Sequence, residues 1–284
     1  MMNAMSHLQP GQQLDRYLLE SEIGAGGMGI VYRAQHQLLG TWVALKVLDP
    51  RLASDARFVQ RFALEAQTAA RLQHPNIVKV SDVGQAEGWY FIVMEFLEGI
   101  PLDRWLREHQ RCSPQEAVGI LRQVAAALDH AHAHNLVHRD VKPANILLRD
   151  GADEHAARQA ILTDFGIAKI LEGVQLTATG MSMGTPDYMA PEQVSGDPVG
   201  AQTDVYALGV VYFEMLTNVL PFSADTPIAV LLKHMSDEPP SPRLLVPDLP
   251  VTLDEVLHRA LAKKPRERYA SAGEFAAAID RAVA

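Results

Sequence analysis

The sequence predicts an α+β protein with two lobes, a small β-rich N-lobe that contains one main helix and a larger, mainly helical C-lobe. Five short segments between residues 17 and 97 are rich in β-branched and aromatic residues, and one segment there has apolar residues at helical spacing. From residue 98 onward the apolar pattern is mainly helical. At 284 residues, the chain also approaches the length at which a second hydrophobic core forms.

The small lobe is expected over residues 17–97, after a flexible N-terminal segment over residues 1–16. Its helix is expected from about residue 56 to residue 72, with Ser54 as the N-cap, because a Ser side chain can accept a hydrogen bond from the free amides of the first turn. The last strand of this lobe, residues 89–94, is followed by a linker to the second lobe.

The large lobe is expected over residues 98–284. Three of its helices are predicted to begin with a capping box, in which a Ser or Thr precedes a Glu by three residues. These boxes begin at Ser113, Thr252 and Ser271. Residues 237–250 contain five prolines and predict an extended loop between helices, and the polar stretch 149–159 predicts a surface insertion before a strand.

The composition excludes several classes of partner. The formal net charge is −9, and most of the acidic excess falls in the large lobe, which argues against a nucleic-acid partner. Cys112 is the single cysteine, so the chain cannot form an intrachain disulfide and fits a reducing compartment. No run of 18 apolar residues predicts a membrane span, and residues 1–13 lack the blocks of a signal peptide. We therefore expect a cytoplasmic location.

Two motifs in the C-lobe predict phosphoryl transfer from a nucleotide. Residues 138–145 read His-Arg-Asp-Val-Lys-Pro-Ala-Asn, and Asp-Phe-Gly follows at residues 164–166. A phosphoryl group in transfer carries charge on its equatorial oxygens, so a protein catalyses the reaction mainly by positioning the reactants and neutralising that charge. The two motifs supply a base, a cation and two metal-binding oxygens in this order, which makes a solvated polar loop an improbable alternative.

Each of these side chains has an expected role. Asp140 is expected to orient or deprotonate the incoming hydroxyl, and Lys142 to meet the transferred phosphate. Asn145 and Asp164 offer hard oxygen atoms, which Mg²⁺ prefers together with phosphate oxygens.

A glycine-rich segment predicts the cradle for the nucleotide. Residues 24–31 read Gly-Ala-Gly-Gly-Met-Gly-Ile-Val and fit the pattern GxGxxGxV. A Rossmann turn would open a helix, whereas the residues on both sides of this segment favour strands, so the glycines are expected to join two strands of a hairpin. Lys46 follows in the apolar strand 41–47, where a lysine needs a partner, and Glu65 on the predicted helix is the expected one.

Through these motifs the chain resembles the protein kinases, and more narrowly the eukaryotic-like (Hanks-type) serine/threonine kinases of bacteria. The resemblance covers residues 17–283 and includes Gly-Thr-Pro-Asp-Tyr-Met-Ala-Pro-Glu at residues 184–192. It also includes residues 204–209, which resemble the start of the family's central buried helix, and Arg268, which resembles the arginine that pairs with Glu192. The family implies a bilobal protein-kinase fold, ATP with Mg²⁺ or Mn²⁺, and an active site between the lobes.

The resemblance also implies the remaining site residues. Met94 would be the gatekeeper, the backbone of residues 95–97 would meet the adenine, and Thr185 and Glu192 would belong to the substrate platform. The ATP-binding residues implied in this way are Ile23, Gly24, Ala25, Gly26, Gly27, Met28, Gly29, Val31, Ala44, Lys46, Met94, Glu95, Leu97 and Leu147. Lys142 is the variant that serine/threonine kinases carry.

The activation segment, residues 164–192, predicts regulation by autophosphorylation. The bacterial relatives imply Thr177 and Thr179 as the modified sites. A phosphothreonine carries a charge of about −1.5 to −2 and could pair with Arg139, which lies beside Asp140. Loop threonines without a regulatory role are the alternative.

The sequence leaves three other functions open: a nucleotide-binding pseudokinase scaffold, a small-molecule phosphotransferase, and a module that binds phosphopeptides. The expected partners are proteins with Ser or Thr acceptors, with a homodimer for trans-autophosphorylation as a further possibility. The chain could also be the cytoplasmic part of a longer membrane-anchored receptor kinase. His130 and His134 have the spacing of metal ligands, but no third ligand is evident on the same helical face.

Overall fold

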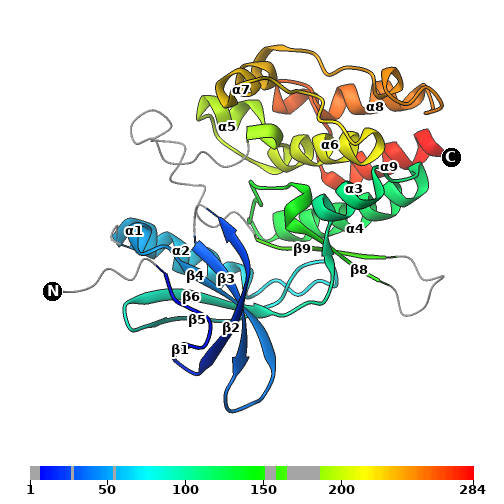
Figure 1. Cartoon of the computed structure of the whole chain (residues 1–284). Coiled ribbons are helices and arrows are strands. Elements are labelled where there is room, and N and C mark those ends of the chain that lie inside the picture. Colours follow the sequence, from blue (N-terminus) through cyan, green and yellow to red (C-terminus); the bar gives the residue numbers. More distant parts are fainter. Residues whose placement is uncertain (1–6, 27–28, 54–55, 151–157, 165–185) are drawn as a thin grey trace. The chain divides into compact units, whose positions relative to one another are not determined.

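The computed structural model describes the chain except residues 1–6, 27–28, 54–55, 151–157 and 165–185 (Figure 1). The described residues fold into two compact units. Unit 1 contains residues 7–73 and 78–98, and unit 2 contains residues 74–77 and the described residues from 99 onward. Unit 1 is mainly β-structure and unit 2 mainly helical, so the predicted α+β class is confirmed.

Unit 1 is built on one antiparallel sheet of six strands in the order β1-β2-β3-β4-β6-β5 (Figure 1). The strands are β1 (Gln13–Leu14), β2 (Tyr17–Gly26), β3 (Gly29–His36), β4 (Trp42–Leu48), β5 (Val80–Ala86) and β6 (Trp89–Glu95). Consecutive side chains of a strand point to opposite faces, so each strand gives one set of residues to the core. On β4 that set is Leu45 and Val47, which pack with Tyr32 of β3 and Phe91 of β6.

The sequence predicted a flexible N-terminal segment over residues 1–16, but part of this segment is packed against unit 1. Leu8 and Leu14 are 7% and 0% exposed and belong to the core of unit 1. β1 pairs with β2, and the Tyr32 hydroxyl donates a hydrogen bond to the carbonyl oxygen of Leu8 at 2.7 Å. The expectation is therefore wrong for residues 8–14, because burying two leucines offsets the entropy lost on ordering the segment.

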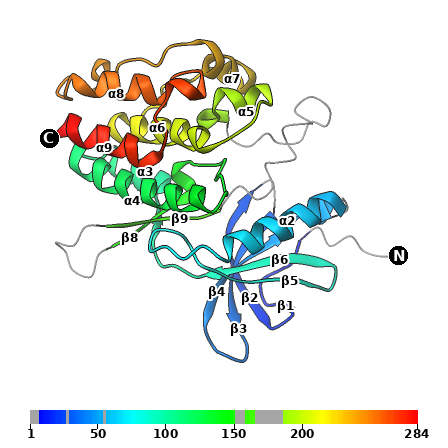
Figure 2. The same cartoon turned by 180° about the vertical axis from the view of Figure 1, so that it is seen from behind.

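Two helices follow β4 in unit 1, α1 (Pro50–Ala53) and α2 (Ala56–Ala69), and α2 lies along the sheet beside β5 (Figure 2). α2 is the predicted helix, but it ends three residues early. The amides of Arg71 and Leu72 bond to carbonyls three residues back, so the chain tightens into a turn there. The predicted N-cap, Ser54, lies outside the described residues.

Unit 2 is mainly helical, with a three-stranded sheet in the order β7-β8-β9. Its helices are α3 (Leu102–His109), α4 (Pro114–Ala133), α5 (Pro191–Ser195), α6 (Ala201–Thr217), α7 (Pro227–Ser236), α8 (Thr252–Ala260) and α9 (Ala272–Val283). Its strands are β7 (Ile100–Pro101), β8 (Ile146–Arg149) and β9 (Gln159–Leu162). Short 3-10 turns lie at Pro143–Asn145, Pro186–Tyr188, Pro242–Leu244 and Pro265–Glu267.

The centre of unit 2 is α6, which contacts α4, α8 and α9. Nearly all residues of α6 from Thr203 to Thr217 are buried, as expected for the predicted central helix. A helix that is apolar on every side must be surrounded by other elements. The proline-rich stretch between α7 and α8 has no α-helix, as predicted, although it contains the turn Pro242–Leu244.

The three predicted capping boxes have different outcomes. The box at Ser113 is complete, because its hydroxyl accepts from the Glu116 amide and Glu116 accepts from the Ser113 amide. Ser271 caps α9, but Glu274 accepts from the Ala270 amide and not from Ser271. The box at Thr252 is wrong, because α8 begins at this residue and its hydroxyl donates to the Ala282 carbonyl oxygen of α9.

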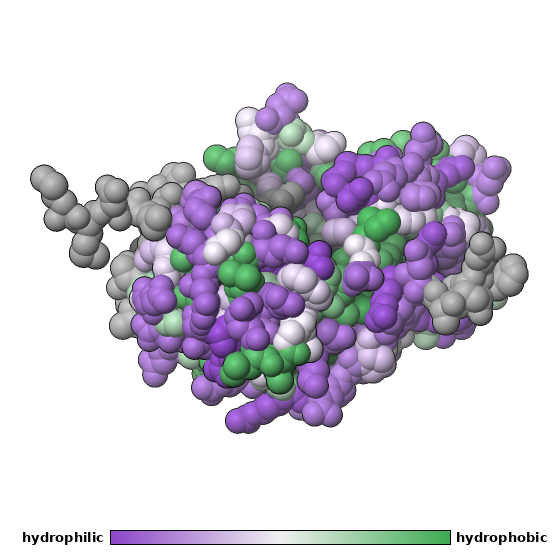
Figure 3. All heavy atoms as spheres, turned by 60° about the horizontal axis from the view of Figure 1, so that its bottom comes forward, coloured by the Kyte–Doolittle hydropathy of each residue, from purple (hydrophilic) through white to green (hydrophobic). Residues whose placement is uncertain are grey.

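Hydrophilic side chains predominate on the face of the molecule drawn in Figure 3, and hydrophobic ones form small separate patches. Within the described residues, none of the helices combines the length and the apolar character needed to cross a bilayer. Cys112 is buried without a disulfide partner, and burial raises the pKa of its thiol to about 12.

Candidate active site

The catalytic loop of unit 2 is held in place by one buried carboxylate. Asp204 of α6 is 0% exposed, and its two oxygens accept hydrogen bonds from the backbone amides of His138 and Arg139, each at 2.8 Å. His132 of α4 adds a third contact through its Nε2 atom at 2.7 Å. Arg139 has a φ of 65°, in the left-handed region that non-glycine residues seldom adopt, and the Asp204 contacts fix this strained turn.

His138 connects the loop to the strand that ends beside it. Its Nδ1 atom accepts from the Asp140 amide at 3.2 Å, so the Nε2 atom carries the proton that faces the Thr163 carbonyl oxygen at 3.0 Å. Burial lowers the pKa of His138, which keeps the imidazole neutral. The loop and the end of β9 are therefore joined by a buried side chain that bonds to both.

Asp140, Lys142 and Asn145 lie together. The Lys142 Nζ atom is 2.9 Å from the Asp140 Oδ2 atom, and the two side chains are 22% and 15% exposed. The Asn145 Nδ2 atom donates to the backbone oxygen of Asp140 at 2.8 Å and to its Oδ2 atom at 3.1 Å. The carboxylate is thus oriented by a cation and an amide while part of it remains accessible.

Asp164 lies at the same end of the small sheet as Asn145. β8 begins directly after Asn145, and Ile146 is the register partner of Leu162 on β9. The Thr163 amide donates to the Asn145 carbonyl oxygen at 2.9 Å, so the backbone of the two segments is joined next to Asp164. Asn145 uses Nδ2 for its bonds to Asp140, which leaves Oδ1 suited to a cation. A carboxylate and an amide oxygen are hard donors that fit Mg²⁺.

The glycine-rich segment of unit 1 joins two antiparallel strands, as predicted, with Gly26 opposite Gly29. Gly27 and Met28 lie outside the described residues. Gly29 has a φ of 147°, and a Cβ atom there would lie 2.0 Å from the Val47 carbonyl oxygen. A Cβ atom at Gly26 would meet no atom of the described residues within 4 Å. Gly29 is therefore required by the fold, whereas Gly26 is not.

Four of the residues predicted to bind the nucleotide share one face of the sheet in unit 1. Val31 pairs with Lys46, and Ala44 pairs with Met94, so these four side chains lie on the face opposite Leu45 and Val47. Ala44 and Met94 are 9% and 7% exposed.

The other predicted nucleotide residues lie at the edges of this face or in unit 2. Glu95 ends β6, and its amide donates to the Lys79 carbonyl oxygen at 2.9 Å. Leu97 follows outside the strand, and Ile23 on β2 is 49% exposed. Leu147 belongs to unit 2, where it pairs with Ile161. Its role toward a nucleotide stays a prediction.

The predicted pair of Lys46 and Glu65 is not decided by the structure. Lys46 lies on β4 with its side chain partly exposed. Glu65 lies on α2, but its side chain is outside the described part of the chain. The phosphosites Thr177 and Thr179 and the platform residue Thr185 also lie outside the described residues. All of these assignments stay predictions.

The end of the activation segment is anchored by a buried ion pair. Arg268 donates to both carboxylate oxygens of Glu192, at 2.7 and 2.8 Å, and the two side chains are 0% and 4% exposed. The Thr203 hydroxyl donates to the same carboxylate at 2.7 Å. The predicted pairing of Arg268 with Glu192 is confirmed, and a bidentate geometry makes it a strong contact.

Sequence reasoning missed several residues that support the site. The Gln193 Nε2 atom donates to the Arg139 carbonyl oxygen at 2.9 Å and so ties the start of α5 to the catalytic loop. The Tyr188 hydroxyl donates to Glu214 of α6 at 2.6 Å, and burial raises the pKa of that carboxyl. No pattern in the sequence points to Gln193, since a glutamine after a proline and a glutamate is an ordinary helix residue.

The rings of the histidine cluster contact one another in tilted pairs. The centroids of His130 and His134 are 4.7 Å apart, and those of His74 and His130 are 5.2 Å apart. In the part of the chain that is described, no group of three or more His, Cys, Asp or Glu side chains has the arrangement of a metal site. Packing of the rings against one another therefore explains why these histidines lie together.

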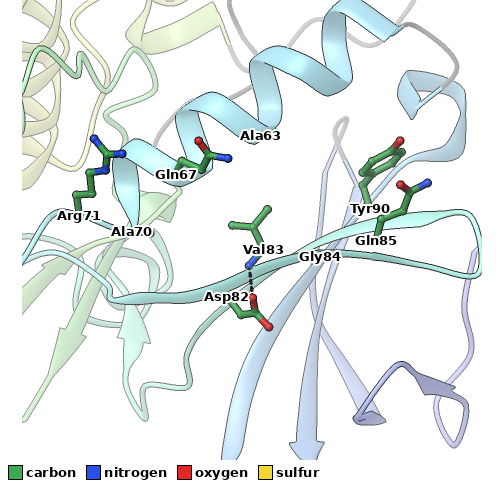
Figure 4. A pocket seen from close by; sticks show the side chains of 9 residues that line it. All are labelled: Ala63, Gln67, Ala70, Arg71, Asp82, Val83, Gly84, Gln85 and Tyr90. Carbon is green, nitrogen blue, oxygen red and sulfur yellow. Dashed lines mark hydrogen bonds between the residues drawn. The ribbon is translucent and has the colours of Figure 1, made fainter.

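A pocket of about 580 Å³ lies elsewhere in unit 1, between α2 and strands β5 and β6 (Figure 4). Its lining residues are Ala63, Gln67, Ala70, Arg71, Asp82, Val83, Gly84, Gln85 and Tyr90. None of the predicted nucleotide residues is among them. Among these residues, the Val83 amide donates a hydrogen bond to the Asp82 carboxylate, so this amide already has a partner.

Residues 17–277 match the family described as the protein kinase domain. This chain belongs to that family. The chain is 39% identical over 267 residues to the serine/threonine-protein kinase PrkC of Bacillus subtilis. The matched region is 94% of this chain and 40% of PrkC. The chain is 44% identical over 269 residues to the serine/threonine-protein kinase PknA of Mycobacterium tuberculosis, which covers 93% of this chain and 60% of PknA.

A solved structure gives the same result. The crystal structure of the Mycobacterium tuberculosis PknI kinase domain has a TM-score of 0.77 to this chain, with 34% identity over 96% of this chain and 99% of that one. The predicted resemblance to the serine/threonine protein kinases, with its bilobal fold class, is confirmed. The chain spans 40% and 60% of the lengths of PrkC and PknA, which are longer proteins.

Proposed function

We propose that this kinase domain transfers the γ-phosphate of ATP to Ser and Thr hydroxyls of proteins. The observation that carries the proposal is the joining of Asp140, Lys142 and Asn145 by contacts of 2.8 to 3.1 Å, next to the strand end that bears Asp164. A scaffold that only bound nucleotide would not need a carboxylate that is oriented by both a cation and an amide.

In the proposed mechanism, Asp140 accepts a hydrogen bond from the hydroxyl of the protein substrate. This contact directs the hydroxyl oxygen toward the γ-phosphorus of ATP. Lys142, held 2.9 Å from Asp140, neutralises charge on the transferred group. Asn145 and Asp164 would hold Mg²⁺ or Mn²⁺, and the bound ion would supply positive charge beside the phosphate oxygens. The hydrogen bond from Asn145 to Asp140 couples the position of the base to that of the metal ligands.

The nucleotide is proposed to lie against the face of unit 1 that carries Val31, Ala44 and Met94, with the backbone of residues 95–97 at its edge. Apolar side chains suit the faces of a purine ring. Lys46 on the same face would reach the α- and β-phosphates, with Glu65 orienting it. Glycines at 24 and 26 leave room for the phosphates to approach the backbone.

We also propose activation by autophosphorylation at Thr177 and Thr179. The support is Arg139, whose Nε atom is buried and makes no hydrogen bond among the described residues. A guanidinium with a buried N–H that has no hydrogen-bond partner favours an anionic partner, and a phosphothreonine supplies charge-assisted hydrogen bonds. Mass spectrometry of active protein should find both threonines phosphorylated. A Thr177→Ala, Thr179→Ala double variant with full activity would contradict this.

The test of the proposed function is transfer of label from γ-labelled ATP with Mg²⁺ or Mn²⁺ to the kinase domain and to a basic test protein. Acid hydrolysis should release labelled phosphoserine or phosphothreonine, and an Asp140→Asn variant should give no label. Label in neither protein would favour the pseudokinase scaffold. Label on a small hydroxyl compound but not on protein would favour the small-molecule phosphotransferase.

The assembly is also a matter of proposal. Because PrkC and PknA are longer than this chain, we propose that the domain works as the cytoplasmic catalytic part of a longer kinase. We further propose a homodimer for trans-autophosphorylation. Wild-type domain should then label an Asp140→Asn variant that is mixed with it, and at concentrations too low for the dimer to persist the initial rate of autophosphorylation should rise with the square of the protein concentration. Absence of label on the Asp140→Asn variant in the mixture would contradict trans-autophosphorylation.

A further inference from the structure

The face of the sheet assigned to the nucleotide continues beyond Ala44 into a stack of aromatic and cationic side chains. Arg33 on β3 is the register partner of Ala44 on β4, and Gln35 is the partner of Trp42. Because side chains two residues apart share a face, Arg33 and Trp42 lie on the same face as Val31 and Ala44. The motif that predicts the nucleotide site assigns no role to either residue.

The Arg33 guanidinium lies over two aromatic rings. Its Cζ atom is 4.1 Å from the ring centroid of Trp42 and 5.1 Å from that of Phe96. Both distances are within the range at which a cation is attracted by the ring electrons. Glu20 on β2 adds an ion pair at 3.0 Å to Nε, although that N–H makes no hydrogen bond among the described residues. Stacking and charge attraction therefore hold the guanidinium.

Phe96 lies in the middle of the segment expected to meet the adenine. β6 ends at Glu95, and Phe96 and Leu97 belong to no helix or strand. The ladder of the sheet therefore stops just before the two residues, which leaves a larger part for side-chain contacts in positioning their backbone. The contact of Phe96 with Arg33 is the cation–π contact that ties this segment to β3.

We propose that Trp42, Arg33 and Phe96 form a stack that fixes the backbone of residues 95–97 in the geometry that hydrogen-bonds the adenine. The inference rests on the proposed nucleotide site. These three residues are positioning residues, because they act on the adenine through the backbone beside Phe96. Their loss should weaken nucleotide binding and leave the chemistry of phosphoryl transfer intact.

The test compares Arg33→Ala and Trp42→Ala with the wild-type kinase domain. Each should raise the KM for ATP roughly fivefold, as expected for losing one or two cation–π contacts, with kcat changed less than about twofold. Trp42→Phe, which keeps a ring under the cation, should recover most of the affinity. Leu39→Ala serves as the matched control, because Leu39 lies in the same hairpin and is 71% exposed.

A second readout separates positioning from general loosening of the fold. Binding of adenosine should fall by the same factor as binding of ATP, because the stack acts on the base and not on the phosphates. Lys46→Met should weaken ATP binding and leave adenosine binding unchanged. The double variant Arg33→Ala, Trp42→Ala should bind ATP no more weakly than the weaker-binding single variant, because the two changes disrupt the same stack.

The outcomes distinguish this inference from the proposed function. A wild-type domain that neither binds ATP nor transfers label overturns both. A wild-type domain that works, with KM unchanged in Arg33→Ala and Trp42→Ala at unchanged Tm, overturns the stack alone. Should the alanine variants lose Tm, the ratio of KM between Trp42→Phe and Trp42→Leu decides, and a ratio of one contradicts the stack.

Discussion

At the scale of single residues, the site depends on buried charges that are fully paired. Glu192 receives hydrogen bonds from both terminal nitrogens of Arg268 and from Thr203, and Asp204 receives two backbone amides and His132. A buried charge is costly unless its hydrogen bonds are complete. Pairs of this kind stabilise the fold weakly when intact and cost much when one partner is removed.

We predict that Arg268→Ala lowers the free energy of unfolding by about 3–5 kcal/mol, because it leaves the Glu192 carboxylate buried and unpaired. The double variant Arg268→Met, Glu192→Leu should recover a large part of this loss, since neither charge then remains. Urea unfolding followed by circular dichroism measures the unfolding free energies of the single and the double variant. Equal stability of the single and double variants would show that packing, and not charge, holds the activation segment.

A second prediction concerns the pH dependence of stability at His234 of α7. Burial, followed by the charge of Lys263, lowers the pKa of this imidazole to about 4, and its Nδ1 atom lies 2.8 Å from the Tyr206 hydroxyl. An unfolded histidine has a pKa of about 6.5. The pKa of the folded form is thus depressed, so the stability that His234 contributes is complete above a pH of about 6.5 and is lost as the pH falls toward about 4.

His234→Gln removes the titrating group and keeps a hydrogen-bond acceptor for Tyr206. The free energy of unfolding of the wild-type domain should fall more steeply between pH values of about 6.5 and about 4 than that of the variant. Urea titrations at a series of pH values measure the difference between the two proteins, in which the contributions of the carboxylates cancel. Parallel curves would show that the pKa of His234 is not depressed in the folded state.

At the scale of elements, local sequence rules predict best where one residue type is physically required. The glycine segment was expected to join two strands, and it does so because Gly29 has a φ of 147° and approaches the backbone of β4. The capping box at Thr252 failed because the helix start is set by packing against α9, where the Thr252 hydroxyl finds the Ala282 carbonyl oxygen. A tertiary contact of this kind leaves no local signal.

We predict that two glycines of the motif respond differently to alanine. Gly29→Ala should lower the unfolding free energy, because a Cβ atom there would lie 2.0 Å from the Val47 carbonyl oxygen. Gly26→Ala should leave stability within about 1 kcal/mol of wild type, because a Cβ atom there would meet no atom of the described residues within 4 Å. It should raise the KM for ATP, because the phosphates are proposed to approach the backbone there. Thermal unfolding and initial rates measure the two effects. Equal stability losses would show that both glycines serve only the fold.

At the scale of the whole molecule, the sequence predicted the class of the fold and the family, because both follow from motifs of fixed spacing and from hydrophobic periodicity. It did not predict that Leu8 and Leu14 complete the core of unit 1. A single apolar residue outside a periodic segment gives no sign in the sequence of the residues that it packs against. The structure shows that β1, which contains Leu14, pairs with β2. The hydrogen bonds of Gln193 and Tyr188 were missed because their partners lie 54 and 26 residues away, and such contacts leave no local pattern in the sequence.

In the proposed function, phosphoryl transfer by this domain depends on three side chains of unit 2, Asp140, Asn145 and Asp164, acting together on MgATP. The most direct measurement is titration calorimetry of ATP with and without Mg²⁺ on wild type, Asp164→Asn and Asp140→Asn, combined with label transfer from γ-labelled ATP. We predict that Asp140→Asn binds MgATP like the wild type and transfers no label, whereas Asp164→Asn loses the part of the affinity that depends on Mg²⁺. Label transfer by Asp140→Asn at the wild-type rate, or an unchanged Mg²⁺ dependence in Asp164→Asn, would contradict these roles.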